Sequence, residues 1–204
     1  MVDWYRRFGD IPGVSYEQQP SIDRRRLRGH DAVPEVHVHE FEGKRRESLW
    51  WPEKQGGTSA SPAHGRAFSD SRDVRASSLL QNVCEGLELP GEPSDYHFLI
   101  QSCASEMWKR RREEPEMLDE VERLCKLDIQ LVQARPDAVS DQYSEQPIFY
   151  AILAFGILID MYEREGQLAE ALEVAESAAR FGQAEKERIE LKERIAAVEH
   201  EDSA

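Results

Sequence analysis

The stretch Ile148-Phe149-Tyr150-Ala151-Ile152-Leu153-Ala154-Phe155-Gly156-Ile157-Leu158-Ile159 is the most apolar part of this 204-residue chain. Its twelve uncharged residues would make only about 18 Å of helix, well short of the ~30 Å hydrocarbon core of a bilayer. Charged residues follow at once, beginning with Asp160 and Glu163. We therefore expect residues 148–159 to form the central, buried helix of a bundle. A contact with membrane or lipid is the less favoured alternative.

A second helix is expected directly after this one. The first helix has an apolar face whose residues lie three and four apart: Phe155, Leu158, Ile159 and Tyr162. Gly166 predicts the end of that helix, because glycine adopts the left-handed conformation of a C-terminal cap without a side-chain penalty. The next apolar stripe is Leu168, Ala171, Leu172, Ala175, Ala178 and Ala179. Its alanines let two helix backbones approach closely, so the pattern predicts a tight antiparallel hairpin.

These residues, from Phe155 through Gly166 to Ala178, resemble one tetratricopeptide repeat, a unit of 34 residues, over about residues 152–183. Two positions depart from the family pattern. Ile159 stands where a small residue is usual, and Phe181-Gly182-Gln183 replaces the closing proline turn. The resemblance implies a short right-handed stack of antiparallel helical hairpins, and an ordinary bundle hairpin is the alternative. It also implies which residues form the hairpin core or contact a partner: Phe155, Leu158, Tyr162, Leu168, Ala171, Leu172 and Ala175.

Charge is distributed unevenly along the chain. Residues 1–78 hold 13 basic and 12 acidic residues, whereas residues 79–204 hold 13 and 28, a net charge of −15. An acidic half would repel a phosphate backbone, so nucleic-acid binding is not expected, and a basic or amphipathic protein partner is favoured. The three cysteines, Cys84, Cys103 and Cys125, form no CxxC pair and predict no disulfide framework. With no secretory signal at the N-terminus, we expect a reducing, cytoplasmic compartment.

Residues 1–72 are expected to form a flexible region of low complexity, followed by a helical domain over residues 73–204. Glycine and proline interrupt residues 1–32, and residues 52–78 are rich in Gly, Ser, Ala and Pro. Within the first segment, aromatic residues at helical spacing are candidates for a short docking element: Trp4, Tyr5 and Phe8. The basic run at residues 24–28 leaves three interpretations open: contact with nucleic acid or an anionic membrane, a solvated arm, or pairing within the chain with the acidic helical half.

One β-hairpin is predicted at residues 34–51, where valine and histidine alternate before a glycine. A lone two-stranded hairpin is marginal in water, so we expect Trp50 and Trp51 to anchor it. His37 and His39 would face the same side of a strand, which makes them weak candidates for metal ligands. A metal site needs at least a third ligand, and no recognised spacing supplies one.

Four further helices are predicted from apolar periodicity, over residues 73–87, 94–113, 115–134 and 184–199. The last has a narrow apolar strip of Leu191, Ile195 and Val198, as a capping helix requires. The chain has no phosphate-binding glycine loop, no GxSxG elbow and no HExxH helix. The cysteines fall at apolar helical positions, where cysteine usually serves as a small hydrophobe. We therefore predict no catalytic residues and no cofactor.

The sequence is thus expected to encode a mainly helical, non-enzymatic interaction module or adaptor with a groove for a peptide or helix of a partner protein. Self-association is allowed, and the identity of the partner is left open. The alternative is a small metal-dependent enzyme that uses the N-terminal histidines on the helical scaffold.

Overall fold

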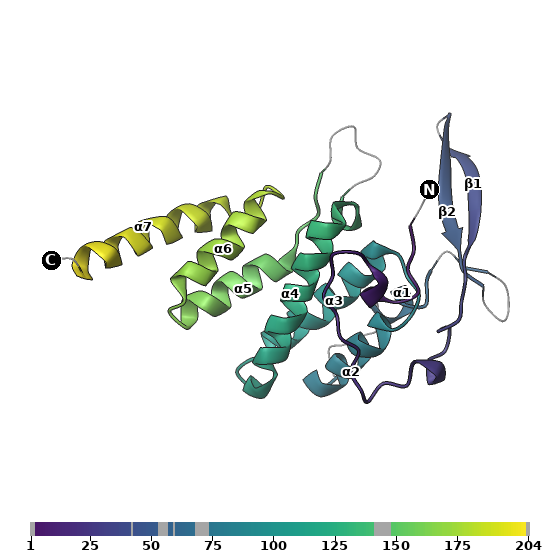
Figure 1. Cartoon of the computed structure of the whole chain (residues 1–204), viewed down its shortest axis with the longest axis horizontal. Helices are drawn as coiled ribbons and strands as arrows, with labels where there is room; N and C mark the ends of the chain where they lie inside the picture. The colour runs from purple at the N-terminus through teal and green to yellow at the C-terminus, as the bar shows by residue number, and fades with distance from the viewer. Residues whose placement is uncertain are drawn as a thin grey trace. The chain divides into compact units, whose positions relative to one another are not determined.

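The computed structural model describes residues 3–41, 43–52, 57–58, 60–67, 74–140 and 148–202. This part of the chain is mainly helical and contains one two-stranded antiparallel sheet, which confirms the predicted fold class (Figure 1). The chain divides into two compact units, residues 1–138 (unit 1) and residues 139–204 (unit 2). Composition predicted a boundary of another kind at residue 72, between a flexible region and a helical domain.

Unit 1 is built on three helices that follow one another in the chain: α2 (Ala76–Leu87), α3 (Pro93–Lys109) and α4 (Leu118–Ala134). The predicted ranges agree with these to within a few residues. Helix α3 packs against both α2 and α4, and also against the short α1 (His64–Ala67). The apolar stripes that predicted the helices form the core, in which the largest buried aliphatic side chains include Leu79, Leu87, Leu99, Ile100, Met107 and Leu124.

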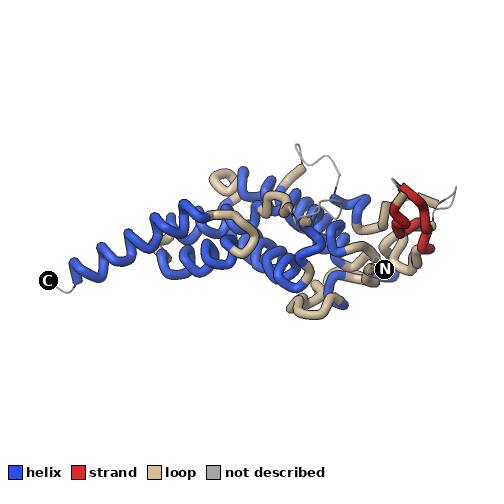
Figure 2. The backbone as a smooth tube through the Cα atoms, turned by 90° about the horizontal axis from the view of Figure 1, so that it is seen from above, coloured by secondary structure: helices blue, strands red, loops and turns tan. Residues whose placement is uncertain are grey.

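The predicted hairpin is present as β1 (Glu35–Phe41) and β2 (Lys44–Trp50). The strands pair without interruption from Glu35 opposite Trp50 to Phe41 opposite Lys44, and Gly43 takes the positive φ of 72° that the tight turn needs. In both views the hairpin projects to one side of the helices of unit 1 (Figures 1 and 2). Of its two expected anchors, Trp51 is buried against Trp4 with the ring centroids 5.7 Å apart, whereas Trp50 is exposed.

The N-terminal segment packs on the helices of unit 1, although its composition predicted a weakly structured arm. Tyr5 and Gly91 exchange two backbone hydrogen bonds, of 2.9 and 3.1 Å. Phe8 is fully buried, and its ring meets that of Tyr96 edge-on at 5.5 Å. The Tyr96 hydroxyl donates a 2.8 Å hydrogen bond to the Leu89 carbonyl. Of the aromatic docking element expected from Trp4, Tyr5 and Phe8, Phe8 is therefore part of the core, whereas Trp4 and Tyr5 are half-buried.

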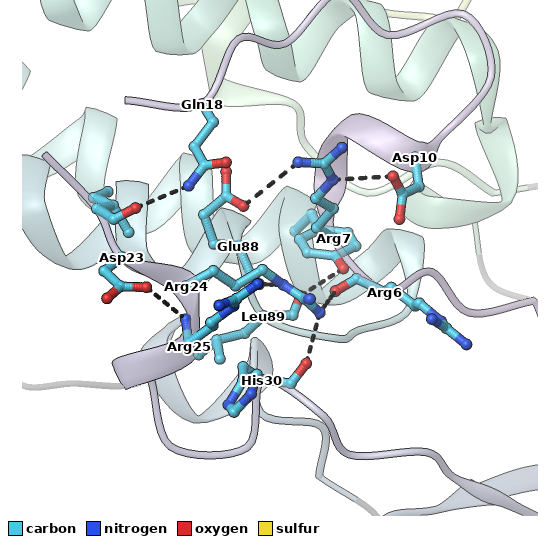
Figure 3. Close-up of polar contacts among 12 residues, drawn as sticks. Arg6, Arg7, Asp10, Gln18, Asp23, Arg24, Arg25, His30, Glu88 and Leu89 are labelled. Atoms are coloured by element: carbon cyan, nitrogen blue, oxygen red, sulfur yellow. Dashed lines mark hydrogen bonds and ion pairs between the residues drawn. The ribbon is translucent and has the colours of Figure 1, made fainter. Parts of the chain in front are cut away.

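Hydrogen bonds from the Arg24 side chain hold the N-terminal segment in place (Figure 3). Its guanidinium donates to three backbone carbonyls on separate stretches of the chain, those of Arg6 (3.1 Å), His30 (2.6 Å) and Glu88 (2.9 Å). This arginine therefore pairs within the chain, but with backbone carbonyls and not with carboxylates of the acidic half, as one interpretation of the basic run had expected. The next residue, Arg25, has an exposed side chain.

Unit 2 contains three consecutive helices, α5 (Leu153–Arg164), α6 (Leu168–Ala179) and α7 (Glu185–Asp202). Helix α6 packs against both α5 and α7. Gly166 ends α5 with a φ of 76°, as predicted, and the Gln167 amide donates to the Tyr162 carbonyl at 2.8 Å. Helix α7 contributes the buried Leu191 and forms ion pairs with both helices of the hairpin, Arg194 with Glu163 and Lys192 with Glu176.

The prediction of one helix over residues 148–159 is wrong in its first part, because α5 begins only at Leu153. Residues 148–152 have no helical structure, and Phe149 forms an isolated antiparallel bridge with Ser140. Their backbone groups have other partners: the Tyr150 amide donates to the Val139 carbonyl at 2.7 Å. An apolar run does not by itself distinguish a helix from a buried extended segment.

Candidate interaction surface

The predicted hairpin residues lie together between α5 and α6. Phe155, Leu158 and Tyr162 of α5 are buried, as are Ala171 and Ala175 of α6. The buried alanines of α6 thus allow α5 and α6 to pack closely, as the sequence predicted. Leu168 and Leu172 are only half-buried. These contacts form a structural core, so a surface for a partner has to be sought among exposed residues of the same unit.

Three large hydrophobic side chains are exposed where the chain enters α5. Ile148 is 59% exposed, Tyr150 47% and Leu153 45%. Single exposed hydrophobic residues are common, but three of them within six positions are an unusual concentration. We call Ile148, Tyr150 and Leu153 the 148–153 surface. The sequence placed these residues in a buried helix, so their exposure was not foreseen.

The 148–153 surface is held by contacts from the end of α6. The Gln183 side chain accepts a 3.0 Å hydrogen bond from the Ile152 amide and donates a 3.0 Å bond to the Tyr150 carbonyl. Phe181 is buried beside the segment, with its ring 5.2 Å from that of Phe149. A surface that is fixed in this way has less entropy to lose when a partner binds.

This surface is open at the start of α5, and it belongs to a unit that is acidic as a whole. Gly156 lies one helical turn after Leu153, is exposed, and has no atom within 4 Å of the position that a Cβ would occupy. A partner backbone would therefore meet no side chain there. Unit 2 holds fifteen Asp and Glu residues against six Lys and Arg, a net charge of −9. Such a field favours a cationic partner.

His37 and His39 lie on β1, and both are exposed. The ring of His37 stacks on that of Trp50 with 5.4 Å between centroids, and its Nε2 is 3.8 Å from Glu35 Oε2. Across the described ranges, no group of three or more His, Cys, Asp or Glu residues is placed to hold a metal ion. Within this part of the chain the two histidines therefore have no third ligand.

The three cysteines are free and buried in unit 1, at the apolar helical positions where the sequence placed them. Burial raises the pKa of each thiol, that of Cys125 most strongly. A thiol with a raised pKa is a poor nucleophile at neutral pH.

A buried polar pair that the sequence analysis missed joins α3 to α4. His97 Nδ1 lies 2.7 Å from Asp128 Oδ1, and both side chains are completely buried. His97 Nε2 and Asp128 Oδ2 have no hydrogen-bond partner among the described residues. Burial raises the pKa of Asp128, and the neighbouring His97 opposes this effect. The sequence did contain a signal for this pair, because Asp128 lies on the same helix face as the apolar residues Leu124 and Cys125.

Ser61, His64 and Asp95 are the residue types of a hydrolase triad, but their arrangement is different. In a triad the serine hydroxyl donates to the imidazole. Here Ser61 Oγ donates to Asp95 Oδ2 at 2.7 Å, while His64 Nδ1 lies 3.0 Å from Asp95 Oδ1. Asp95 Oδ2 also accepts a 2.8 Å bond from the Glu92 amide. The cluster therefore joins α1 to the first turn of α3.

The same cluster predicts that unit 1 loses stability as the pH rises. Burial, and then the charge of Asp95, raise the pKa of Glu92 to about 7, while a hydrogen bond to Asp95 raises the pKa of His64. Both groups bind a proton more tightly in the folded than in the unfolded state. Their stabilising contributions are therefore present near pH 5 and are lost as the pH rises to 8.

Glu92→Gln keeps a neutral side chain at every pH. We expect it to raise the free energy of unfolding by about 1 kcal/mol at pH 8, after allowance for partial exposure, and to change it little at pH 5. Urea denaturation at the two pH values measures this difference. Glu116→Gln, at an exposed position of the same unit, is the matched control and should show no pH-dependent gain. Equal effects of Glu92→Gln at both pH values would contradict the assignment.

Comparison with known proteins provides no relative: no family model matches the sequence, and neither the curated proteins nor the solved structures contain a match. Among the helices described, none has both the length and the apolar character needed to cross a bilayer.

Proposed function

We propose that this chain is a non-enzymatic interaction module or adaptor that binds an amphipathic segment of a partner protein through its 148–153 surface. The observation that carries the proposal is the exposure of Ile148, Tyr150 and Leu153 on a segment that Gln183 and Phe181 hold in place. An amphipathic helix that lays its apolar face on such a surface is a common mode of peptide recognition. The tetratricopeptide-like hairpin predicted from the sequence fits this role.

The charge of unit 2 indicates the chemistry of the partner. A net charge of −9 favours a segment whose apolar stripe is flanked by lysine and arginine. The acidic side chains would then speed association and orient the segment, while the apolar contacts would supply most of the affinity. The free cysteines agree with a cytoplasmic location for this interaction.

The double variant Ile148→Asp/Leu153→Asp tests the proposal, because it places two charges in the 148–153 surface without removing a buried side chain. Proteins captured from the cells of origin by the wild-type chain would be identified, purified and titrated against both forms. We expect at least about a tenfold loss of affinity in the double variant, since loss of a central anchor residue costs about 2 kcal/mol or more and each ~1.4 kcal/mol is tenfold in affinity.

Val198→Asp is the matched control, because Val198 is an equally exposed hydrophobic residue of unit 2 on α7. It should leave the affinity unchanged. Circular dichroism of all three proteins checks that the helices are retained. A captured partner that binds the double variant as tightly as the wild type, or that loses affinity equally with the control, would overturn the proposal.

A further inference from the structure

We propose that Zn²⁺ joins two copies of this chain through the outer edge of β1, with His37 and His39 of each copy as its four ligands. The inference is independent of the 148–153 surface, because it concerns the hairpin of unit 1. It depends on three observations: an unpaired strand edge, two histidines on one face of that strand, and the segment His37-Val38-His39, whose sequence is the same in both directions.

The first observation is that β1 has an edge open to another strand. The described sheet contains only β1 and β2, so one side of β1 pairs with no strand of the described chain. In an antiparallel ladder, every second residue turns its amide and carbonyl away from the partner strand. Proteins usually block such an edge with charged side chains, lysine above all, with proline or with a bulge. Residues 35–41 contain no lysine or proline, their register with β2 is unbroken, and their two carboxylates, Glu35 and Glu40, lie outside the segment from His37 to His39.

The second observation concerns the ligands. His37 and His39 are two residues apart on a strand, so their side chains project from the same face of the sheet. Both are exposed, and histidine is a common ligand of zinc. A structural zinc site needs four ligands in a tetrahedron, and the described residues of one chain supply no group of three. Two histidines from each of two chains would complete the set.

The third observation is the symmetry of the segment His37-Val38-His39. A two-fold axis perpendicular to the sheet and midway between the Val38 residues of two copies would pair β1 with β1 in antiparallel order. His37 of each copy would then lie opposite His39 of the other. Residues directly opposite have Cβ atoms about 4.5–5.5 Å apart, and neighbours on one face of a strand are about 7 Å apart. The four imidazoles would therefore gather on one face, within reach of a single ion.

The opposite face would gain apolar contacts from the same pairing. Val36 and Val38 are 52% and 48% exposed in the single chain. In the two-fold arrangement Val38 would meet Val38 of the second copy, and the sheet would grow from two strands to four. Sheets of three or more strands are more stable than an isolated hairpin. Strand pairing and zinc binding would thus support each other.

Sedimentation velocity of the tag-free full-length chain tests this proposal, with EDTA or with zinc chloride added to the metal-free protein. We expect a monomer in EDTA and a dimer with zinc, with one zinc ion bound per two chains. His37→Gln/His39→Gln should abolish the response to zinc. His200→Gln on α7 should keep it, because this histidine lies outside the hairpin.

A second pair of variants tests the register. Val38→Glu leaves all four ligands in place but sets two carboxylates face to face at the two-fold axis, so it should weaken zinc-dependent dimerisation by at least about tenfold. Val33→Glu, at an exposed position before the strand, should not. The proposal is overturned by a chain that stays monomeric in zinc or by a dimer that forms equally in EDTA. Zinc-dependent dimerisation of the double histidine variant, or a dimer indifferent to Val38→Glu, would also overturn it.

Discussion

Replacing Arg24 with alanine is expected to lower the free energy of unfolding of unit 1 by about 3 kcal/mol. The Arg24 guanidinium donates to the carbonyls of Arg6, His30 and Glu88, which lie on three separate stretches of chain (Figure 3). Hydrogen bonds from a charged donor are each worth roughly 1.5–3 kcal/mol, and their loss would leave these carbonyls without this donor. The segment that carries the buried Phe8 would lose one of its attachments at the same time.

Tryptophan fluorescence during guanidinium denaturation measures this effect selectively, since all four tryptophans, at positions 4, 50, 51 and 108, belong to unit 1. Arg25→Ala is the matched control, because the neighbouring side chain is exposed and should matter by no more than about 0.5 kcal/mol. Arg24→Lys should recover only part of the loss, since an ammonium group cannot reproduce the planar fork of donors. Similar losses for Arg24→Ala and Arg25→Ala would show that Arg24 is a solvated residue after all.

Removing one member of the buried pair between α3 and α4 should have a comparable or larger effect. For Asp128→Ala we expect a loss of about 3–5 kcal/mol, because His97 would remain completely buried without its 2.7 Å partner. His97→Ala should be similarly costly, since it leaves the Asp128 carboxyl group buried alone. Denaturation followed by fluorescence again reports the unit concerned.

The double variant His97→Ala/Asp128→Ala separates the pairing from simple loss of packing. If the two groups stabilise each other, the double variant should cost less than the sum of the single variants, by about 0.5–3 kcal/mol. Lys126→Ala on the exposed side of α4 controls for changes in helix propensity and should cost no more than about 0.5 kcal/mol. Strict additivity of the two single variants would mean that the pair contributes nothing as a pair.

Much of the helical structure could be predicted from periodicity alone. The stripes of α2, α3, α4 and α6 were long and regular, and Gly166 marked the end of α5. These features are local, because a helix face and its cap depend on residues within a few positions of each other. The tetratricopeptide resemblance of the hairpin stays a prediction, since the packing of two helices is shared by many helical folds.

The features that could not be predicted depend on contacts between distant residues. Nothing local distinguishes Arg24 from the other arginines beside it, because the carbonyls that bind it belong to residues 6, 30 and 88. The 148–153 surface was missed for the same reason. An apolar run fits a buried helix. In the structure, however, the backbone of residues 150–152 bonds to Val139 and to the side chain of Gln183, some thirty positions away.

The cysteines of the chain provide a chemical reporter for the first unit alone. Cys84, Cys103 and Cys125 all belong to unit 1, are buried, and have thiol pKa values raised by that burial, whereas residues 139–204 contain no cysteine. An alkylating reagent would therefore modify the native chain slowly, and its rate would follow the transient opening of the first unit alone. Mass spectrometry of the labelled chain would then measure the rate of that opening, with no contribution from α5, α6 or α7.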